Sequence, residues 1–206
     1  MFVSRLLRWS GLSLLLGGLL SSLFWIFHPE EHLLLENPGA YQAEHLLGFV
    51  GYMLFTLGIF GLYARLAENA RWIGFAGFIV VTLCMFVLIG VNTIDTFIWP
   101  SIAQIQPELI LSTDGEFNET SLPFAKSISL VIPASIIAIV GMIFLGVAIW
   151  RSGIFPRWAG VLLIVSSALF YIGPGFVPHE QLLINLLVFG PFIAATTWLG
   201  IGMVRQ

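Results

Sequence analysis

Six long apolar stretches, separated by short polar segments, dominate the pattern of this chain. They cover residues 9–27, 46–63, 72–91, 128–150, 158–177 and 182–204. A helix that crosses a membrane needs about 20 mostly apolar residues, and each stretch has that character with almost no charge. None of them alternates like a barrel strand, and backbone groups inside lipid must pair within their own segment. The pattern therefore predicts an all-α membrane protein, a six-transmembrane-helix bundle in a single integral membrane domain over residues 1–206.

The composition supports this class of protein and excludes others. Charged residues make up 9% of the chain, against about 25% in soluble globular proteins. A formal net charge of -3 gives no basic surface for nucleic acid. The single cysteine, Cys84, excludes an intrachain disulfide and a cysteine zinc site. The expected partner is the lipid bilayer of the cell membrane, in a multi-pass arrangement, and a homo-oligomer or larger membrane complex stays open.

The charges also predict an orientation. In a six-span arrangement, seven of the eight basic residues fall on one side and only Lys126 falls on the other. All acidic residues except Glu68 fall on or near the side opposite the arginines. Short loops rich in Lys and Arg stay in the cytoplasm, so both termini are expected to be cytoplasmic.

A tetrapeptide, Arg-Trp-x-Gly, opens each helix that runs outward from the cytoplasm. Its three copies begin with Arg8-Trp9, Arg71-Trp72 and Arg157-Trp158. Arginine at the headgroups, tryptophan in the aromatic belt and glycine at a helix contact account for the pattern as an interfacial anchor. The spacing extends further, because Arg8 precedes Pro29 by 21 residues and Arg157 precedes Pro178 by 21 residues. This favours duplicated hairpins, and hence a bundle of three parallel helical hairpins.

Two longer segments are expected to form outer loops, residues 28–45 and 100–126. Asn37-Pro38-Gly39 is a turn signal in the first loop. The apolar run Leu33-Leu34-Leu35 is expected to lie on the bilayer surface or to pack on the helices. In the second loop, residues 102–111 are expected to form a short interfacial helix.

Polar or helix-breaking residues interrupt the apolar stretches at Asn92, Pro133, Pro174, Asn185 and Pro191. Broken helices line substrate sites in transporters, which gives these positions a functional interpretation. Proline is also common in membrane helices, and asparagine there serves as a hydrogen-bond partner between helices. Both interpretations stay open at this point.

Histidine and carboxylate side chains gather near the outer ends of the spans. The candidate residues of an outer-face polar or metal site are His28, His32, His45, Asp95, His179 and Glu180. If spans 1, 2, 3 and 6 pack together, His28, His45, Asp95 and His179 converge at one vestibule. Imidazole and carboxylate suit a divalent metal, two histidines suit a haem, and a histidine cluster suits pH sensing. Alternatively these are solvated loop residues, since adjacent His and Glu point to different sides of a helix.

Two segments resemble small multi-pass bacterial integral membrane proteins of unknown function. They are Gly61-Leu62-Tyr63-Ala64-Arg65-Leu66 and Pro156-Arg157-Trp158-Ala159-Gly160-Val161-Leu162-Leu163. The resemblance covers spans 2–5 and implies a multi-pass membrane fold without implying an activity.

The expected function is non-enzymatic, and no catalytic residue is assigned. The sequence has no phosphate-binding loop, no nucleophile elbow and no His-Glu-x-x-His helix. We expect an accessory protein, a sensor, or a binder of lipid or a small apolar ligand, with a polar outer-face vestibule and no cofactor. A small solute transporter or channel is the first alternative, and a membrane redox protein that binds a divalent metal or haem is the second.

Overall fold

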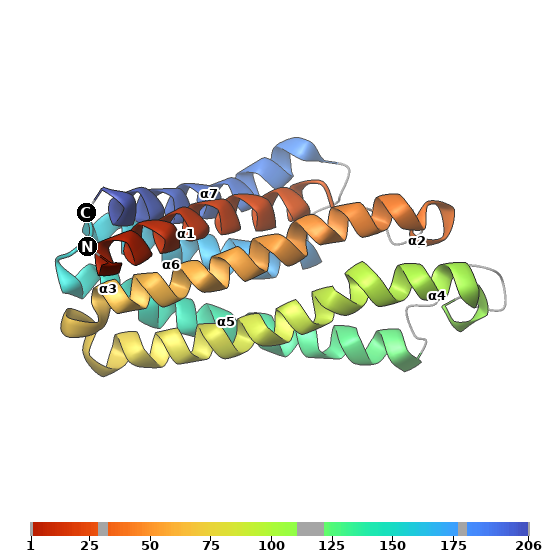
Figure 1. The fold of residues 1–206 in the computed structure, drawn as a ribbon, viewed down its shortest axis with the longest axis horizontal. Helices are drawn as coiled ribbons and strands as arrows, with labels where there is room; N and C mark the ends of the chain where they lie inside the picture. Colours follow the sequence, from red (N-terminus) through yellow and green to blue (C-terminus); the bar gives the residue numbers. More distant parts are fainter. Residues whose placement is uncertain (1, 29–32, 111–121, 177–180, 206) are drawn as a thin grey trace.

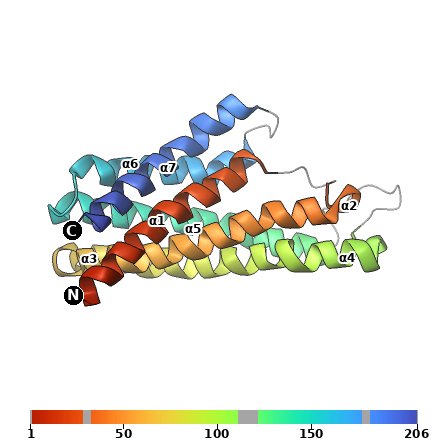
Figure 2. The same cartoon turned by 45° about the horizontal axis from the view of Figure 1, so that its top comes forward.

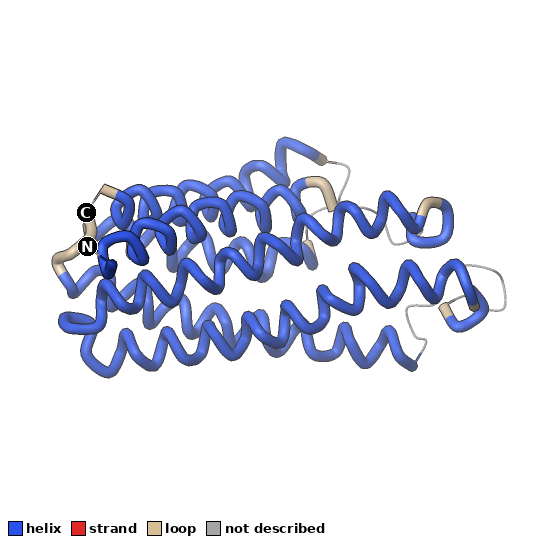
Figure 3. Tube along the Cα trace, viewed as in Figure 1, coloured by secondary structure: helices blue, strands red, loops and turns tan. Residues whose placement is uncertain are grey.

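Long helices run along the long axis of the molecule in the computed structural model (Figures 1 and 3). The structure describes residues 2–28, 33–110, 122–176 and 181–205, and this part of the chain contains helices and short connections without a strand. The five longest helices are α1 (Phe2–Ile26), α3 (Pro38–Thr93), α5 (Leu122–Ser152), α6 (Arg157–Ile172) and α7 (Leu182–Val204). The all-α prediction is therefore confirmed.

Four helical segments among the described residues are long and apolar enough to cross a membrane. They are Arg5–Ile26, Pro38–Ile105, Ser129–Ser152 and Leu182–Val204. Helix α6 is a shorter apolar helix over Arg157–Ile172. Length and composition thus support a membrane protein, as the hydrophobic pattern predicts.

Helix α3 folds back on itself at Arg71. The backbone of this residue has φ 51° and ψ -155°, which is not helical. It divides α3 into a first arm, residues 38–70, and a second arm, residues 72–93, that lie alongside each other (Figure 1). The next sharp turn, between α5 and α6, uses Gly153 with φ 70°. Both turns fall in the short arginine-flanked segments of the sequence.

The helices approach one another closely where glycines face a neighbouring backbone. Helix α1 packs against the first arm of α3 and against α7, while α5 packs against the second arm and against α6. A Cβ atom added to Gly58 would lie 2.5 Å from the Cα atom of Leu14 in α1. One added to Gly146 in α5 would lie 2.7 Å from the carbonyl oxygen of Gly160 in α6. No larger residue fits at these contacts, so the glycines set the separation between the helices.

The two ends of the bundle differ. Both termini and the turn at Arg71 lie at one end, which we call the terminal end (Figures 1 and 2). The opposite, far end carries α2 (Leu33–Glu36), the π-helical turn η1 (Ile94–Ile98), α4 (Trp99–Ile105) and the 3-10 turn η2 (Pro107–Leu109). These pieces pack around the buried side chains of Leu34, Tyr41, Trp99 and Ile110. We call this assembly the cap.

The expected outer loops are largely helical, which corrects the sequence interpretation. Helix α3 begins at Pro38 rather than near residue 46, because the Asn37 side chain accepts a hydrogen bond of 3.1 Å from the Ala40 backbone N–H. An asparagine cap followed by proline at the first helical position is a helix start, not a reverse turn. In the segment 100–126, the short helix expected over residues 102–111 lies instead at Trp99–Ile105. Helix α5 already begins at Leu122, and residues 111–121 lie outside the described part.

At two of the positions where a helix break was one interpretation, the helix continues. Helices α5 and α7 continue through Pro133 and Pro191. A proline removes one backbone hydrogen bond, and the turns on either side keep theirs, so the helix bends or continues instead of ending. Pro174 does end a helix, since Gly173–Gly175 forms the 3-10 turn η3 after α6.

Candidate functional site

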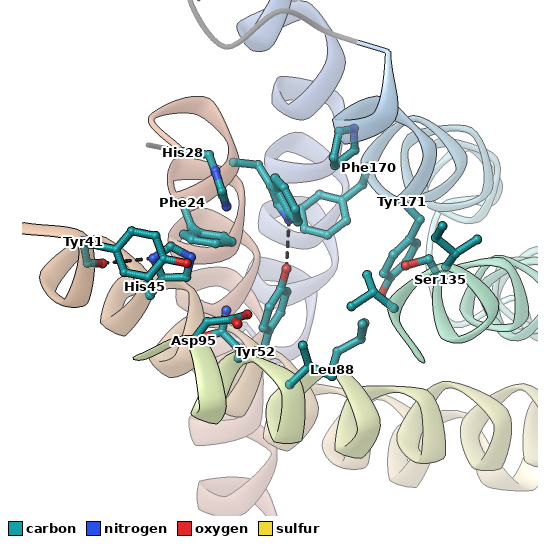
Figure 4. Close-up of a pocket in the computed structure, with 16 residues that line it drawn as sticks. Phe24, His28, Tyr41, His45, Tyr52, Leu88, Asp95, Ser135, Phe170 and Tyr171 are labelled. Atoms are coloured by element: carbon teal, nitrogen blue, oxygen red, sulfur yellow. Dashed lines mark hydrogen bonds between the residues drawn. The ribbon is translucent and has the colours of Figure 1, made fainter. Parts of the chain in front are cut away.

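A cavity of about 320 Å³ lies between α1, both arms of α3, α5 and α6, in the half of the bundle near the far end (Figure 4). Aromatic rings form much of its lining. They belong to Phe24, Trp25, His28, Tyr41, His45, Tyr52, Phe170 and Tyr171. The remaining lining residues are Leu88, Val91, Asn92, Asp95, Val131, Ile132, Ser135 and Pro174.

Contacts between rings join α1 to the first arm of α3. The indole of Trp25 stacks on His28 with ring centroids 4.9 Å apart, and His28 meets His45 edge-on at 5.2 Å. His45 in turn stacks on Tyr41 at 3.9 Å. Tyr41 and His45 are four residues apart in one helix, so their rings lie on the same face one turn apart.

His45 is a deeply buried polar side chain on this wall. It is 2% exposed, and its Nδ1 lies 3.0 Å from the Tyr41 carbonyl oxygen. A carbonyl only accepts, so Nδ1 carries a proton and Nε2 of the neutral ring remains an acceptor. Its neighbour Glu44 does not line the cavity.

Trp25 and Tyr52 are held together by a hydrogen bond. The indole Nε1 donates to the Tyr52 hydroxyl at 2.8 Å (Figure 4). On the α6 side, the Tyr171 hydroxyl points to the Met85 sulfur of the second arm at 3.9 Å. These contacts fix the orientation of three lining rings, so the cavity is formed by ordered side chains.

Asp95 is the one carboxylate among the described lining residues, which include no lysine or arginine. It is half-buried and belongs to the π-helical turn η1, which follows directly on the second arm of α3. One turn earlier, Asn92 also lines the cavity, and its carbonyl accepts a hydrogen bond of 2.7 Å from the Thr96 hydroxyl. A π-helical turn inside a helix frequently marks a functional site.

The structure places the sequence candidates in different surroundings. His28, His45 and Asp95 all line the cavity, together with Asn92 and Pro174. Their role as a binding site stays a prediction. Pro133, Asn185 and Pro191 are not part of the lining; the Asn185 side chain instead donates to the Ile26 carbonyl at 3.4 Å and joins α7 to α1. The other three candidates, His32, His179 and Glu180, lie outside the described residues.

Two observations on the described residues concern metal and haem binding. Within the described ranges, no three His, Cys, Asp or Glu side chains are grouped so that they could hold a metal ion. His28 and His45 touch edge to ring, and Phe24 packs on both. That contact leaves no space for a macrocycle between the two imidazoles.

The repeated Arg-Trp-x-Gly tetrapeptide has one structural pattern in all three copies. Trp9, Trp72 and Trp158 are 68%, 69% and 68% exposed, and the arginine before each is exposed as well. The glycines that follow, Gly11, Gly74 and Gly160, are buried. Each of these glycines faces a neighbouring helix: Gly11 faces α7, and the other two face α5. The tetrapeptide therefore combines an outward aromatic ring with an inward helix contact.

The sequence interpretation missed the aromatic character of the site. Phe24-Trp25 and Phe170-Tyr171 are adjacent aromatic pairs near the outer ends of two predicted spans. These pairs were the sequence signal that could have indicated an aromatic site.

Comparisons with protein-family models, with curated proteins and with solved structures found no match to this chain.

Proposed function

We propose that this chain is a non-enzymatic, multi-pass integral membrane protein that binds a small, largely aromatic or apolar organic ligand in the cavity, as an accessory, sensor or ligand-binding protein. The observation that carries the proposal is the cavity itself. Ligand sites in proteins are concave, of about 300–1,000 Å³, mostly apolar, and carry a few fixed polar groups. A cavity of about 320 Å³ lined by rings, in which His28, His45 and Asp95 are the ionisable groups other than tyrosine among the described lining residues, has these properties.

The proposed arrangement in the membrane has six spans, formed by α1, the two arms of α3, α5, α6 and α7, as three parallel hairpins. The turn at Arg71 supports two spans within α3. The arginine-rich terminal end is the cytoplasmic side, because basic residues stay inside. The exposed rings of Trp9, Trp72 and Trp158 then lie at the cytoplasmic interface, where tryptophan is favoured. In this arrangement the cavity lies in the outer half of the membrane, below the cap.

A neutral aromatic hydrocarbon tests the proposal. Neopentylbenzene is added to the protein in maltoside micelles, and bound molecules are counted by native mass spectrometry. Wild type is expected to retain one molecule per chain. In Ser135→Phe, a ring added to the cavity wall occupies the space, and binding is expected to fall at least tenfold.

The matched control is Ile136→Phe. Residue 136 is the next position of α5, is 57% exposed and does not line the cavity. This variant is expected to bind as wild type does. If wild type binds no molecule, or if both variants lose binding equally, the cavity is not the ligand site and the proposal fails.

A further inference from the structure

We propose that a groove at the terminal end binds an anionic phospholipid of the cytoplasmic leaflet, with Arg5 and Arg8 on its phosphate. The groove has a volume of about 520 Å³, and its lining residues are Arg5, Arg8, Trp9, Leu12 and Val204. It lies at the opposite end of α1 from the aromatic cavity, and the two share no lining residue. The groove is a second site, which rests on the proposed function only through the cytoplasmic placement of the terminal end.

Four of the five lining residues form one stripe along α1. They are Arg5, Arg8, Trp9 and Leu12. Their spacing of three or four positions places them on one face of the helix, where the side chains change from charged through aromatic to aliphatic. From the first to the last is about 10 Å along the axis. A headgroup layer is about 5–7 Å thick, so the stripe extends from the phosphates past the aromatic belt into the hydrocarbon.

The end of α7 forms the other wall of the groove. The two helices come close at Gly11, where an added Cβ atom would lie 2.7 Å from the Gly200 carbonyl oxygen and 3.2 Å from Cγ2 of Val204. This contact fixes the separation of α1 and α7. Leu12 and Val204 remain partly exposed beside it, and they offer an aliphatic surface to an acyl chain.

The polar end of the groove favours a ligand with net negative charge. Both arginines are exposed, and no acidic residue is among the described residues that line the groove. A guanidinium group stays charged at physiological pH and donates paired hydrogen bonds to phosphate oxygens. Because Arg5 and Arg8 are neighbours on the helix surface, both can bind the same phosphate. Basic pockets between membrane helices on the cytoplasmic side bind anionic lipid headgroups in this way.

The other two copies of Arg-Trp-x-Gly lack the second arginine. Glu68 precedes Arg71 by three residues, and Ile154 precedes Arg157 by three. A continuous stripe is also impossible there, because the backbone of Arg71 is not helical and α6 begins at Arg157. The first copy lies inside a continuous helix, since α1 begins at Phe2. The first copy therefore has the means to hold a lipid, in addition to the anchor role that all three share.

Native mass spectrometry tests the site with two lipids that differ in headgroup charge. Dioleoylphosphatidylglycerol is anionic, whereas dioleoylphosphatidylcholine has the same acyl chains and no net charge. Each lipid is titrated into the full chain in maltoside micelles, and the dissociation constant of the first bound molecule is measured. Wild type is expected to bind phosphatidylglycerol at least tenfold more tightly than phosphatidylcholine. Equal binding of the two lipids overturns the proposal.

Arg5→Gln/Arg8→Gln is expected to weaken the first binding of phosphatidylglycerol at least tenfold. The matched control is Arg151→Gln/Arg157→Gln, which removes two charges from exposed positions at the same end of the bundle but outside the groove (Figure 1). The control is expected to change the affinity less than twofold. Equal losses would show attraction by the whole arginine-rich end and overturn the groove as the site. Unchanged melting temperatures without lipid show that both variants keep their fold.

A soluble phosphate compound shares the headgroup chemistry. Glycerol 1-phosphate in hundredfold excess is expected not to displace phosphatidylglycerol, because it has no acyl chain to contact the apolar wall. Displacement by glycerol 1-phosphate overturns the lipid as the ligand. Failure of neopentylbenzene to bind in the cavity would contradict the proposed function and leave the lipid site standing, whereas equal binding of the two lipids would do the reverse.

Discussion

The Nε1 atom of Trp25 donates a hydrogen bond of 2.8 Å to the hydroxyl of Tyr52, and both side chains line the cavity. The bond joins the end of α1 to the first arm of α3, between residues 27 positions apart in the chain. It is a polar contact inside an apolar bundle, so loss of one side chain leaves the polar group of the other without this hydrogen bond.

Tyr52→Phe tests this contact. Removal of the hydroxyl leaves the indole N–H without its acceptor, and we expect a loss of about 1–2 kcal/mol in the free energy of unfolding in detergent. The indole is also expected to change its emission spectrum. Tyr63→Phe is the control, because no hydrogen bond is found for the Tyr63 hydroxyl among the described residues while its ring contacts Phe75 and Phe78. Equal stability of the two variants would contradict the prediction.

The topology can be checked with two cysteine substitutions at exposed glutamates. Glu68 lies near the turn at Arg71, and Glu108 lies in the cap. In a Cys84→Ala background, a membrane-impermeant thiol reagent is expected to label Glu108→Cys in intact cells and to label Glu68→Cys only after lysis. Labelling of position 68 in intact cells, with position 108 protected, would reverse the proposed orientation.

The repeated tetrapeptide predicts a contrast between Trp72→Phe and Gly74→Leu. The Trp72 ring is 69% exposed, and phenylalanine keeps an aromatic ring there, so a loss below about 1 kcal/mol is expected. A Cβ atom added to Gly74 would lie 3.3 Å from the Cβ atom of Ala148 in α5 and still closer to that of Ala70. Gly74→Leu is expected to lower thermal stability far more, by several kcal/mol. Equal melting temperatures would show that the glycine is no helix contact.

Arg71→Gly is expected to stabilise the protein in detergent. The φ value of 51° with ψ -155° is a conformation that glycine adopts freely and that costs a residue with a side chain about 1–3 kcal/mol. Release of this strain is expected to outweigh the extra freedom of glycine in the unfolded chain and to raise stability by about 1 kcal/mol. Arg65→Gly removes the same charge from a regular helical position and is expected to lower stability by about 1 kcal/mol.

Hydropathy predicts the apolar helices of this protein well, because composition alone decides which segments avoid water. It does not predict where the helices begin: α3 starts at Pro38, through the cap at Asn37, although residues 38–45 lie outside the apolar stretch. Helix formation depends on backbone hydrogen bonds and capping, which continue past the apolar stretch. A proline in an apolar sequence likewise need not end a helix, since α5 continues through Pro133.

The cavity was only partly predictable. The gathering of His28, His45 and Asp95 could be anticipated, because each lies near the outer end of a predicted span. The convergence of rings from α1, α3 and α6 could not, because it depends on how segments far apart in the chain rotate against one another. The π-helical turn at Asp95 has no proline or glycine to signal it.

Tyr41 belongs to two environments, since it is part of the buried core of the cap and also lines the cavity. A molecule that occupies the cavity therefore contacts a residue on which the cap is folded. By thermodynamic linkage, any ligand that favours the ordered position of Tyr41 stabilises the cap by the same free energy with which an ordered cap strengthens ligand binding. Ligand binding in the cavity is thus expected to change the stability of α2 and α4 at the surface of the far end. The helices between them need not change.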